Sequence, residues 1–196
     1  MRDYYDRRAR EYDDWYLGRG LFESRDRPGW DDELERLVEV VASLEPGRTL
    51  DVACGTGFLT RHLRGDVVAL DQSEAMLEEA RRRAPHATFL QGDALALPVP
   101  NESFHRVFTA HFYGHLDDPD RRRFLQEARR VGQELVVVDS SREWSEDDEA
   151  HQERVLNDGS RWQVYKRWFT PEGLAAELGG GETLFAGRWF VAVRAA

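Results

Sequence analysis

Cysteine and lysine are nearly absent from this sequence of 196 residues. Cys54 is the only cysteine, which excludes an intrachain disulfide and a zinc site with four cysteine ligands. Lys166 is the only lysine, so Schiff-base chemistry has a single candidate, in a segment otherwise typical of a strand. No apolar run approaches the roughly 20 residues of a membrane span, and the charged N-terminal segment does not resemble a signal peptide. We therefore expect a protein of the reducing cytoplasm.

Positive charge is also scarce. The chain has 27 Lys and Arg residues against 37 Asp and Glu residues, a net charge of −10 at pH 7. Sequence-independent binding of nucleic acid needs basic surface to displace counterions from phosphates, so nucleic acid is not expected as a partner. This balance is compatible with a site that holds a cation. A hydrophobic share of 41% supports a sizeable core, and the length suits one domain over residues 1–196.

Short apolar strands alternate with amphipathic helices from about residue 48 onward. Five strands are expected, at residues 49–53, 66–70, 87–90, 104–110 and 134–138. This alternation is typical of an α/β fold with a doubly wound (Rossmann-like), mostly parallel sheet. Two final strands, near residues 183–186 and 189–194, are separated by Gly187-Arg188. They predict an antiparallel C-terminal hairpin that brings the sheet to seven strands.

Two regions lie outside this alternation. Residues 1–29 form an N-terminal arm, in which Tyr5, Tyr12 and Tyr16 fall at helical spacing. This aromatic stripe suits either simple packing of a short helix or a lid over a ligand. Residues 140–170 are first polar and acidic and then aromatic, and we expect a loop with one helix followed by an extended segment.

The turn after the first strand carries the strongest sign of a binding site. It reads Asp51-Val52-Ala53-Cys54-Gly55-Thr56-Gly57, and we expect a helix to follow it through about residue 64. Glycines allow a sharp turn and a close approach of the backbone to a ligand, while a helix N-terminus offers free N–H groups to an anion. The acid before the glycines can face an ammonium group, so a zwitterion fits this turn better than a pyrophosphate. A plain strand–helix turn would also explain two glycines.

Further polar residues follow the next strands. Asp71, 20 residues after Asp51, can accept hydrogen bonds from two ribose hydroxyls, although it also suits the start of a helix. Asp93, within Gly92-Asp93-Ala94, can accept an adenine amino proton, and His111 follows the fourth strand. Because parallel strands end at one edge of a sheet, we expect the three carboxylates to face one crevice.

In order and spacing, these motifs resemble those of the class I S-adenosylmethionine-dependent methyltransferases. The resemblance covers about residues 30–140, including Phe104-His105-Arg106-Val107-Phe108. It implies S-adenosylmethionine as cofactor, S-adenosylhomocysteine as product, and in-line transfer of a methyl group to a small-molecule acceptor. Ala53 stands where many members have glycine, although alanine is a common alternative. Residues 109–115 lack the Asn/Asp-Pro-Pro-Tyr pattern of nucleic-acid amino methyltransferases, which leaves nucleobase substrates without support.

The resemblance also assigns roles to residues. The cofactor set comprises Tyr12, Asp51, Ala53, Cys54, Gly55, Thr56, Gly57, Asp71, Gln72, Asp93, Ala94 and His111. Within this set, the glycine loop would hold the methionine moiety, with Asp51 near its ammonium group. Asp71 would bind the ribose, and Asp93 and the Ala94 amide would hydrogen-bond to adenine. Tyr12 would fold over the cofactor. The acceptor pocket would form from residues 1–29, residues 111–116 and an insertion at residues 140–170.

Methyl transfer from a sulfonium needs alignment of nucleophile, methyl and sulfur, and a neutral hydroxyl or protonated amine also needs a base. His111 and His115 stand where such a base would lie, although loop histidines are more often structural. A metal site formed by the two histidines is the weaker interpretation, because Asp117 and Asp118 are explained by a turn before Pro119. We expect no metal.

Two other functions stay open. A nicotinamide-dependent oxidoreductase is disfavoured because Thr60 stands where its third glycine is expected and little chain remains for a substrate domain. A non-catalytic nucleoside-binding protein of the same fold would share all the motifs, since methyl transfer need not depend on an invariant catalytic side chain.

Overall fold

The computed structural model describes residues 1–196 and places seven strands in one central sheet. These strands are β1 (Thr49–Val52), β2 (Val67–Asp71), β3 (Thr88–Gln91), β4 (Phe104–Ala110), β5 (Gly132–Ser140), β8 (Glu182–Ala186) and β9 (Phe190–Ala195). Their order across the sheet is β3-β2-β1-β4-β5-β9-β8, in which β1–β5 pair in parallel and β9 is antiparallel to β5 and β8. The expected doubly wound sheet with an antiparallel C-terminal hairpin is thus confirmed.

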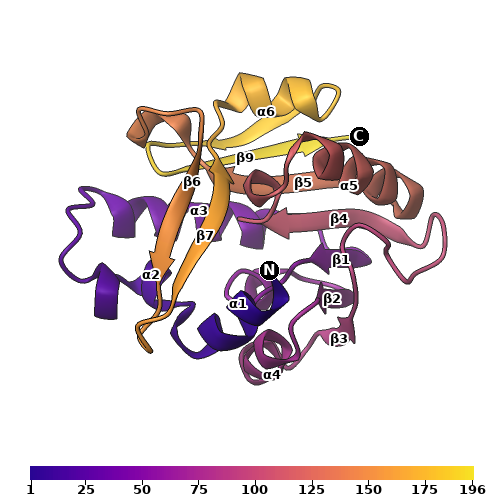
Figure 1. The fold of residues 1–196 in the computed structure, drawn as a ribbon. Coiled ribbons are helices and arrows are strands. Elements are labelled where there is room, and N and C mark those ends of the chain that lie inside the picture. The colour runs from indigo at the N-terminus through magenta and orange to yellow at the C-terminus, as the bar shows by residue number, and fades with distance from the viewer.

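Helices cover both faces of this sheet (Figure 1). They are α3 (Trp30–Ser43) on one face, α5 (Asp118–Val131) and α6 (Pro171–Glu177) on the other, and α4 (Glu74–Arg83) beside β2 and β3. Successive residues of β5 serve opposite faces: Val137 packs with the α5 side, whereas Val136 and Val138 pack with the α3 side. The continuous apolar run of this strand therefore reflects burial on both faces. None of the helices has the combination of length and apolar character that a membrane span needs.

Local caps set where several helices begin. The Ser73 hydroxyl accepts a hydrogen bond from the Met76 amide at 3.2 Å and starts α4 directly after β2. The Asp117 carboxylate accepts from the Asp120 amide at 3.0 Å and starts α5 after β4. Each cap satisfies a backbone donor of the first helical turn. Both sit near the carboxyl ends of the parallel strands, so they also shape the edge at which a ligand would bind.

Two expected helices are absent. After β1 the chain forms only a short 3-10 helix, Thr60–His62, because Gly57 has a φ of +75° and Leu63 is extended. Residues 140–159 contain a 3-10 helix, Arg142–Trp144, and a strand, β6 (Glu149–Val155), where we expected an α-helix. The partner of β6 is β7 (Arg161–Arg167), and β6 alternates between exposed and half-buried residues as an outer strand does.

The β6–β7 hairpin and the N-terminal arm pack against each other near the carboxyl end of β4 (Figure 1). The arm contains the short helices α1 (Arg2–Arg8) and α2 (Asp14–Leu17). Tyr4 of the arm shares a small apolar cluster with Leu156 and Val164 of the hairpin. The Glu11 carboxylate accepts the Asn157 amide at 3.0 and 3.1 Å. Segments about 150 residues apart in the chain thus build one wall over the sheet edge.

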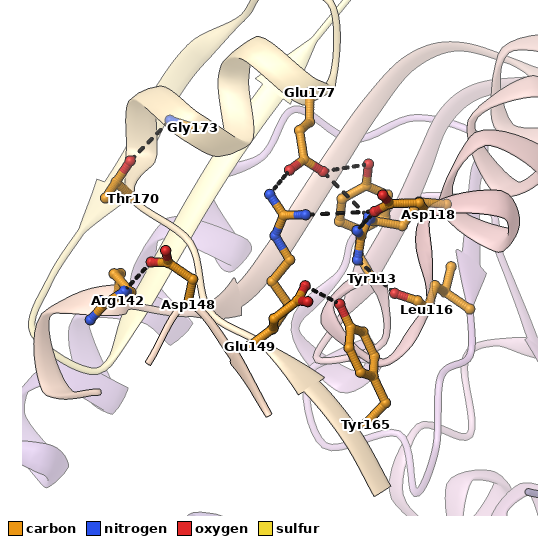
Figure 2. A network of polar contacts seen from close by, with 12 residues as sticks. Tyr113, Leu116, Asp118, Arg142, Asp148, Glu149, Tyr165, Thr170, Gly173 and Glu177 are labelled. Carbon is orange, nitrogen blue, oxygen red and sulfur yellow. Dashed lines mark hydrogen bonds and ion pairs between the residues drawn. The ribbon is translucent and has the colours of Figure 1, made fainter. Parts of the chain in front are cut away.

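A polar network holds the other side of the hairpin to the main domain (Figure 2). Glu177 of α6 accepts a hydrogen bond from the Tyr113 hydroxyl at 3.2 Å and forms an ion pair with Arg167 of β7. Within the hairpin, the Tyr165 hydroxyl donates to Glu149 at 2.7 Å. The hairpin is therefore anchored both to the arm and to the sheet's helical cover.

Candidate functional site

A cleft of about 260 Å³ lies at the carboxyl ends of the parallel strands. The arm, the turn after β1, the end of β2 and the segments after β3 and β4 all contribute to its lining. We call it the strand-end cleft. Of the predicted cofactor residues, it brings together Tyr12, Ala53, Gly55, Asp71, Gln72, Asp93, Ala94 and His111.

The other predicted cofactor residues lie beside this cleft. Asp51, Cys54 and Thr56 line a much smaller hollow, which shares Tyr12 and Ala53 with the strand-end cleft. Gly57 lines neither space; a Cβ there would meet the Ala80 backbone at 3.2 Å, so this glycine allows α4 to pack closely. The expectation that three carboxylates face one crevice is thus met by Asp71 and Asp93 but not by Asp51.

Asp71 organises the turn after β1. One of its carboxylate oxygens accepts the Gly55 amide and the other accepts the Ser73 amide, each at 2.9 Å. Burial raises the pKa of Asp71, although the backbone hydrogen bonds of Ser73 and Gly55 oppose the shift. Since a carboxylate offers about four lone-pair positions, each oxygen still has room for a ligand hydroxyl.

Asp51 is buried behind the turn and accepts a hydrogen bond from the Thr60 hydroxyl at 2.6 Å. Burial raises its pKa to about 7. The Thr60 hydrogen bond lowers this pKa, and the negative charge of Asp71 raises it further. Its carboxyl group is therefore poised between neutral and charged forms near physiological pH, and a neighbouring cation would favour the charged form.

The N-terminal arm closes over the turn through two aspartates. Asp6 accepts a hydrogen bond from the Ser73 hydroxyl at 2.5 Å, and Asp13 accepts one from the Thr56 hydroxyl at 2.5 Å. The Tyr12 ring lies next to Gly55, where a Cβ would approach it to 3.7 Å. Tyr12 was expected in the site from the family resemblance, whereas no role was predicted for the two aspartates, although each directly follows a tyrosine of the arm.

His111 and His115 stand where the strand-end cleft meets a second one. His111 has a φ of +54°, its ring lies among Trp15, Tyr16 and Phe190 at centroid distances of 4.8, 5.6 and 5.6 Å, and neither ring nitrogen has a hydrogen-bond partner. A non-glycine residue in this left-handed conformation is strained, as is often found at functional sites.

Neither histidine has the pKa near 7 that was expected of a general base. Burial lowers the pKa of His111 to about 4 and that of His115 to about 3. Nδ1 of His115 lies 2.7 Å from the Tyr165 carbonyl, which can only accept, so Nδ1 donates and Nε2 keeps its lone pair. Both rings are neutral at physiological pH, and both are weak bases there.

The second cleft has a volume of about 220 Å³ and shares Tyr12, His111 and His115 with the strand-end cleft. We call it the basic cleft, because its cationic lining residues are Arg8, Arg25, Arg154 and Lys166. They come from the end of α1, the loop before α3, β6 and β7. These four residues could not be predicted from the sequence, because no local motif connects segments so far apart. Trp144 and Trp168 also line this cleft.

Comparison with known proteins gives consistent results. A family model described as a methyltransferase domain matches residues 49–135. A demethylmenaquinone methyltransferase of Thermotoga maritima is 38% identical over 102 residues, covering 50% of this chain and 44% of that protein. A 2-phytyl-1,4-naphtoquinone methyltransferase of Thermosynechococcus vestitus is 35% identical over 144 residues, covering 65% of this chain and 59% of that protein. The matches thus span about half the length of these curated relatives.

A solved structure matches nearly the whole chain. The DhpI-SAH complex aligns with a TM-score of 0.73 and 27% identity, over 98% of this chain and 92% of that one. A DhpI-SAM-HEP complex aligns equally well, with a TM-score of 0.73 over 99% of this chain and 95% of that one. The arm and the β6–β7 hairpin therefore fall within the aligned region, and not only the central sheet.

Proposed function

We propose that this chain is a class I S-adenosylmethionine-dependent methyltransferase that transfers a methyl group to a small-molecule acceptor, as its similarity to a methyltransferase domain, to quinone methyltransferases and to the DhpI-SAH complex supports. The observation that carries this proposal is the meeting of two clefts. The strand-end cleft has the glycine turn and the carboxylates that suit a cationic nucleoside, and it joins the basic cleft at Tyr12, His111 and His115. A donor in one cleft and an acceptor in the other would approach each other at this junction.

The lining of the strand-end cleft fits the cofactor chemically. We assign the ribose hydroxyls to the free lone pairs of Asp71, beside Gln72. Adenine is assigned to Asp93, whose Oδ1 accepts the Leu95 amide at 2.8 Å and whose other oxygen has no partner. Asp51 contributes negative charge behind Ala53, where the ammonium group of the methionine moiety would gain from it. When bound, the cofactor supplies a methyl group on a positively charged sulfur.

The chain itself contributes mainly alignment. In-line displacement depends on holding nucleophile, methyl and sulfur in a row, and the two clefts provide that order in space. We assign His111 and His115 to hydrogen bonding at the junction, because their low pKa values keep them neutral but make them poor proton acceptors at pH 7. The arm at residues 1–29 and the insertion at residues 140–170 would hold the acceptor.

Calorimetry and a transfer assay test this function. We expect S-adenosylhomocysteine to bind and NAD to give no response, because the similarities to methyltransferases favour this function over a nicotinamide-dependent oxidoreductase. Transfer of labelled methyl to a panel of small acceptors separates an enzyme from a non-catalytic nucleoside-binding protein. Tight NAD binding without a response to S-adenosylhomocysteine would contradict the proposal.

We further propose a cytoplasmic location and no nucleic-acid or membrane partner. The single cysteine suits a reducing compartment, and the net charge of −10 opposes binding to polyanions.

A further inference from the structure

The basic cleft concentrates positive charge in an acidic protein. Arg8, Arg25 and Arg154 line it, and none of them forms an ion pair with a carboxylate. The only acidic residue in the lining is Glu153, and its carboxylate pairs with Arg161 at 2.5 Å. A protein with a net charge of −10 therefore leaves three guanidinium groups uncompensated around one cavity.

The partners that these arginines do have are neutral. Arg154 donates to the Gln152 side chain at 2.6 Å, while its buried Nε has no hydrogen-bond partner. Arg8 donates to the Tyr4 hydroxyl at 2.7 Å and lies 4.7 Å from the Tyr12 ring centroid. Arg25 lies 4.7 Å from the Phe22 ring centroid. Such contacts orient guanidinium groups and leave N–H donors free for a ligand.

Lys166 adds to the lining without cancelling its charge. Its ammonium pairs with buried Asp139, so the two groups neutralise each other and the arginines remain in excess. Burial lowers the pKa of Arg154, and the nearby positive charges of Arg8 and Arg25 lower it further. Like charges that line one cavity disfavour one another, and an anion between them would offset this. The buried Nε1 of Trp168 is a further N–H donor without a partner in the same lining.

We propose that the basic cleft binds an oxyanion of the acceptor, so that the methyl acceptor is a small organic anion bearing a carboxylate or a phosphoryl group. This inference rests on the proposed function, since it concerns the second substrate of the same site. Arginine binds both groups through paired N–H donors. The volume of about 220 Å³ limits the occupant to a small molecule, and the overall negative charge opposes a polyanionic macromolecule.

The arginines also lie close to the junction of the two clefts, where methyl transfer is proposed to occur. Arg8 lies over Tyr12, which lines both clefts, and the basic cleft shares His111 and His115 with the strand-end cleft. An oxyanion held there is drawn toward the cationic donor in the neighbouring cleft, so its binding and its alignment with the donor reinforce each other.

Calorimetry with simple anions tests the inference. Acetate, inorganic phosphate and methylphosphonate are titrated into protein saturated with S-adenosylhomocysteine, and the stronger binder identifies the carboxylate or the phosphoryl class. Arg154→Gln and Arg25→Gln each remove a charged donor, and we expect each to weaken anion binding about tenfold or more. Arg25 is exposed, so its variant should fold even where the Arg154 variant does not.

Arg122→Gln is the matched control, because Arg122 is an exposed arginine of α5 that lines neither cleft. It should leave anion binding unchanged, and all three variants should keep the affinity for S-adenosylhomocysteine. In a labelled-methyl screen, carboxylates and phosphonates should accept methyl while their neutral amides and diesters do not.

Two results would overturn the inference and can be told apart. If S-adenosylhomocysteine binds but no anion does, or if the arginine variants bind anions as well as the unaltered protein, the anionic acceptor is excluded and the methyltransferase function stands. If anions bind but S-adenosylhomocysteine does not, the proposed function fails, and the anion can no longer be assigned as a methyl acceptor.

Discussion

The two clefts of this protein meet at the same histidines but are built in opposite ways. The strand-end cleft is formed mostly by turns that directly follow parallel strands, and its charged side chains include Asp71 and Asp93. The basic cleft is formed by the arm and the β6–β7 hairpin, and its cationic side chains exceed its acidic ones. Under the two proposals, the sheet edge would receive the cationic donor and the added segments would receive the anionic acceptor.

The clefts also differ in how their charges are supported. Asp71 is held by backbone amides of its own neighbourhood, at 2.9 Å from Gly55 and Ser73. The charge of Lys166, which lines the basic cleft, is instead balanced by Asp139 of another element, β5. Burial alone would raise the pKa of Asp139, but Lys166 reverses this and holds it below its usual range. A substitution that removes Lys166 should therefore lower the stability of the fold more than a substitution of Asp71 does.

The largest effect is expected from Lys166→Met. It leaves the buried Asp139 carboxylate without its counter-charge, which should cost about 3–5 kcal/mol of unfolding free energy. Urea denaturation measures this loss. Adding Asp139→Asn to the same chain should restore part of the stability, and a loss below about 1 kcal/mol in the single variant would show that the pair contributes little.

Asp71→Asn should separate the clefts functionally. Loss of its charge should weaken binding of S-adenosylhomocysteine by about 1–3 kcal/mol, roughly tenfold to a hundredfold, while anion binding stays unchanged. Calorimetry with both ligands measures the two effects. Asp66→Asn, an exposed residue directly before the amino end of the same strand, is the control. An unaltered affinity in the Asp71 variant would remove this residue from the ribose site.

The pH dependence of cofactor binding should report on Asp51, whose pKa is about 7. The pKa of this carboxyl is higher in the folded protein than in the unfolded chain, where it is about 3.9. Protonation of Asp51 therefore favours the unliganded fold at pH values below about 3.9, and this contribution is lost as the pH rises through about 7. A bound ammonium favours the carboxylate, so the affinity for S-adenosylhomocysteine should rise by up to about tenfold per pH unit below 7 and then level off.

Calorimetry from about pH 5.5 to 8.5 tests this dependence. Asp51→Asn should flatten the profile and weaken binding at the upper end. A profile in the variant that still rises toward pH 7 would assign the titration to another group and remove Asp51 from the ammonium site.

The smallest effect is expected from Ala53→Gly. Ala53 has a φ of +57°, where a Cβ costs about 1–2 kcal/mol, and glycine removes this strain but loses more chain entropy on folding. The variant should gain up to about 1 kcal/mol in stability, seen as a higher Tm. Ala94→Gly, whose backbone is not in the left-handed region, is the control and should lower the Tm. A lower Tm for Ala53→Gly would show that the turn after β1 is not strained.

Much of the strand-end cleft could be predicted because its determinants are local. Strand ends follow from short apolar runs: Asp71 is the last residue of β2, and Asp93 follows the end of β3 by two residues. The β6 strand could not be predicted in this way, because it reads Glu149-Ala150-His151-Gln152-Glu153-Arg154-Val155, without an apolar face of its own. Its structure depends on pairing with β7 and on the apolar cluster that Tyr4 forms with the hairpin.

The sequence by itself determined the succession of strands along the chain, the sharp turn at Gly55, and the carboxylates at the end of β2 and just after β3. Periodicity and turn chemistry act over a few residues, so they can be read along the chain. Only the tertiary structure decided that Asp51 lines a separate, smaller hollow beside the strand-end cleft, that burial keeps His111 neutral, and that Arg8 and Arg154 line one cavity. Burial and charge environment depend on neighbours brought together by packing, and no local pattern records them.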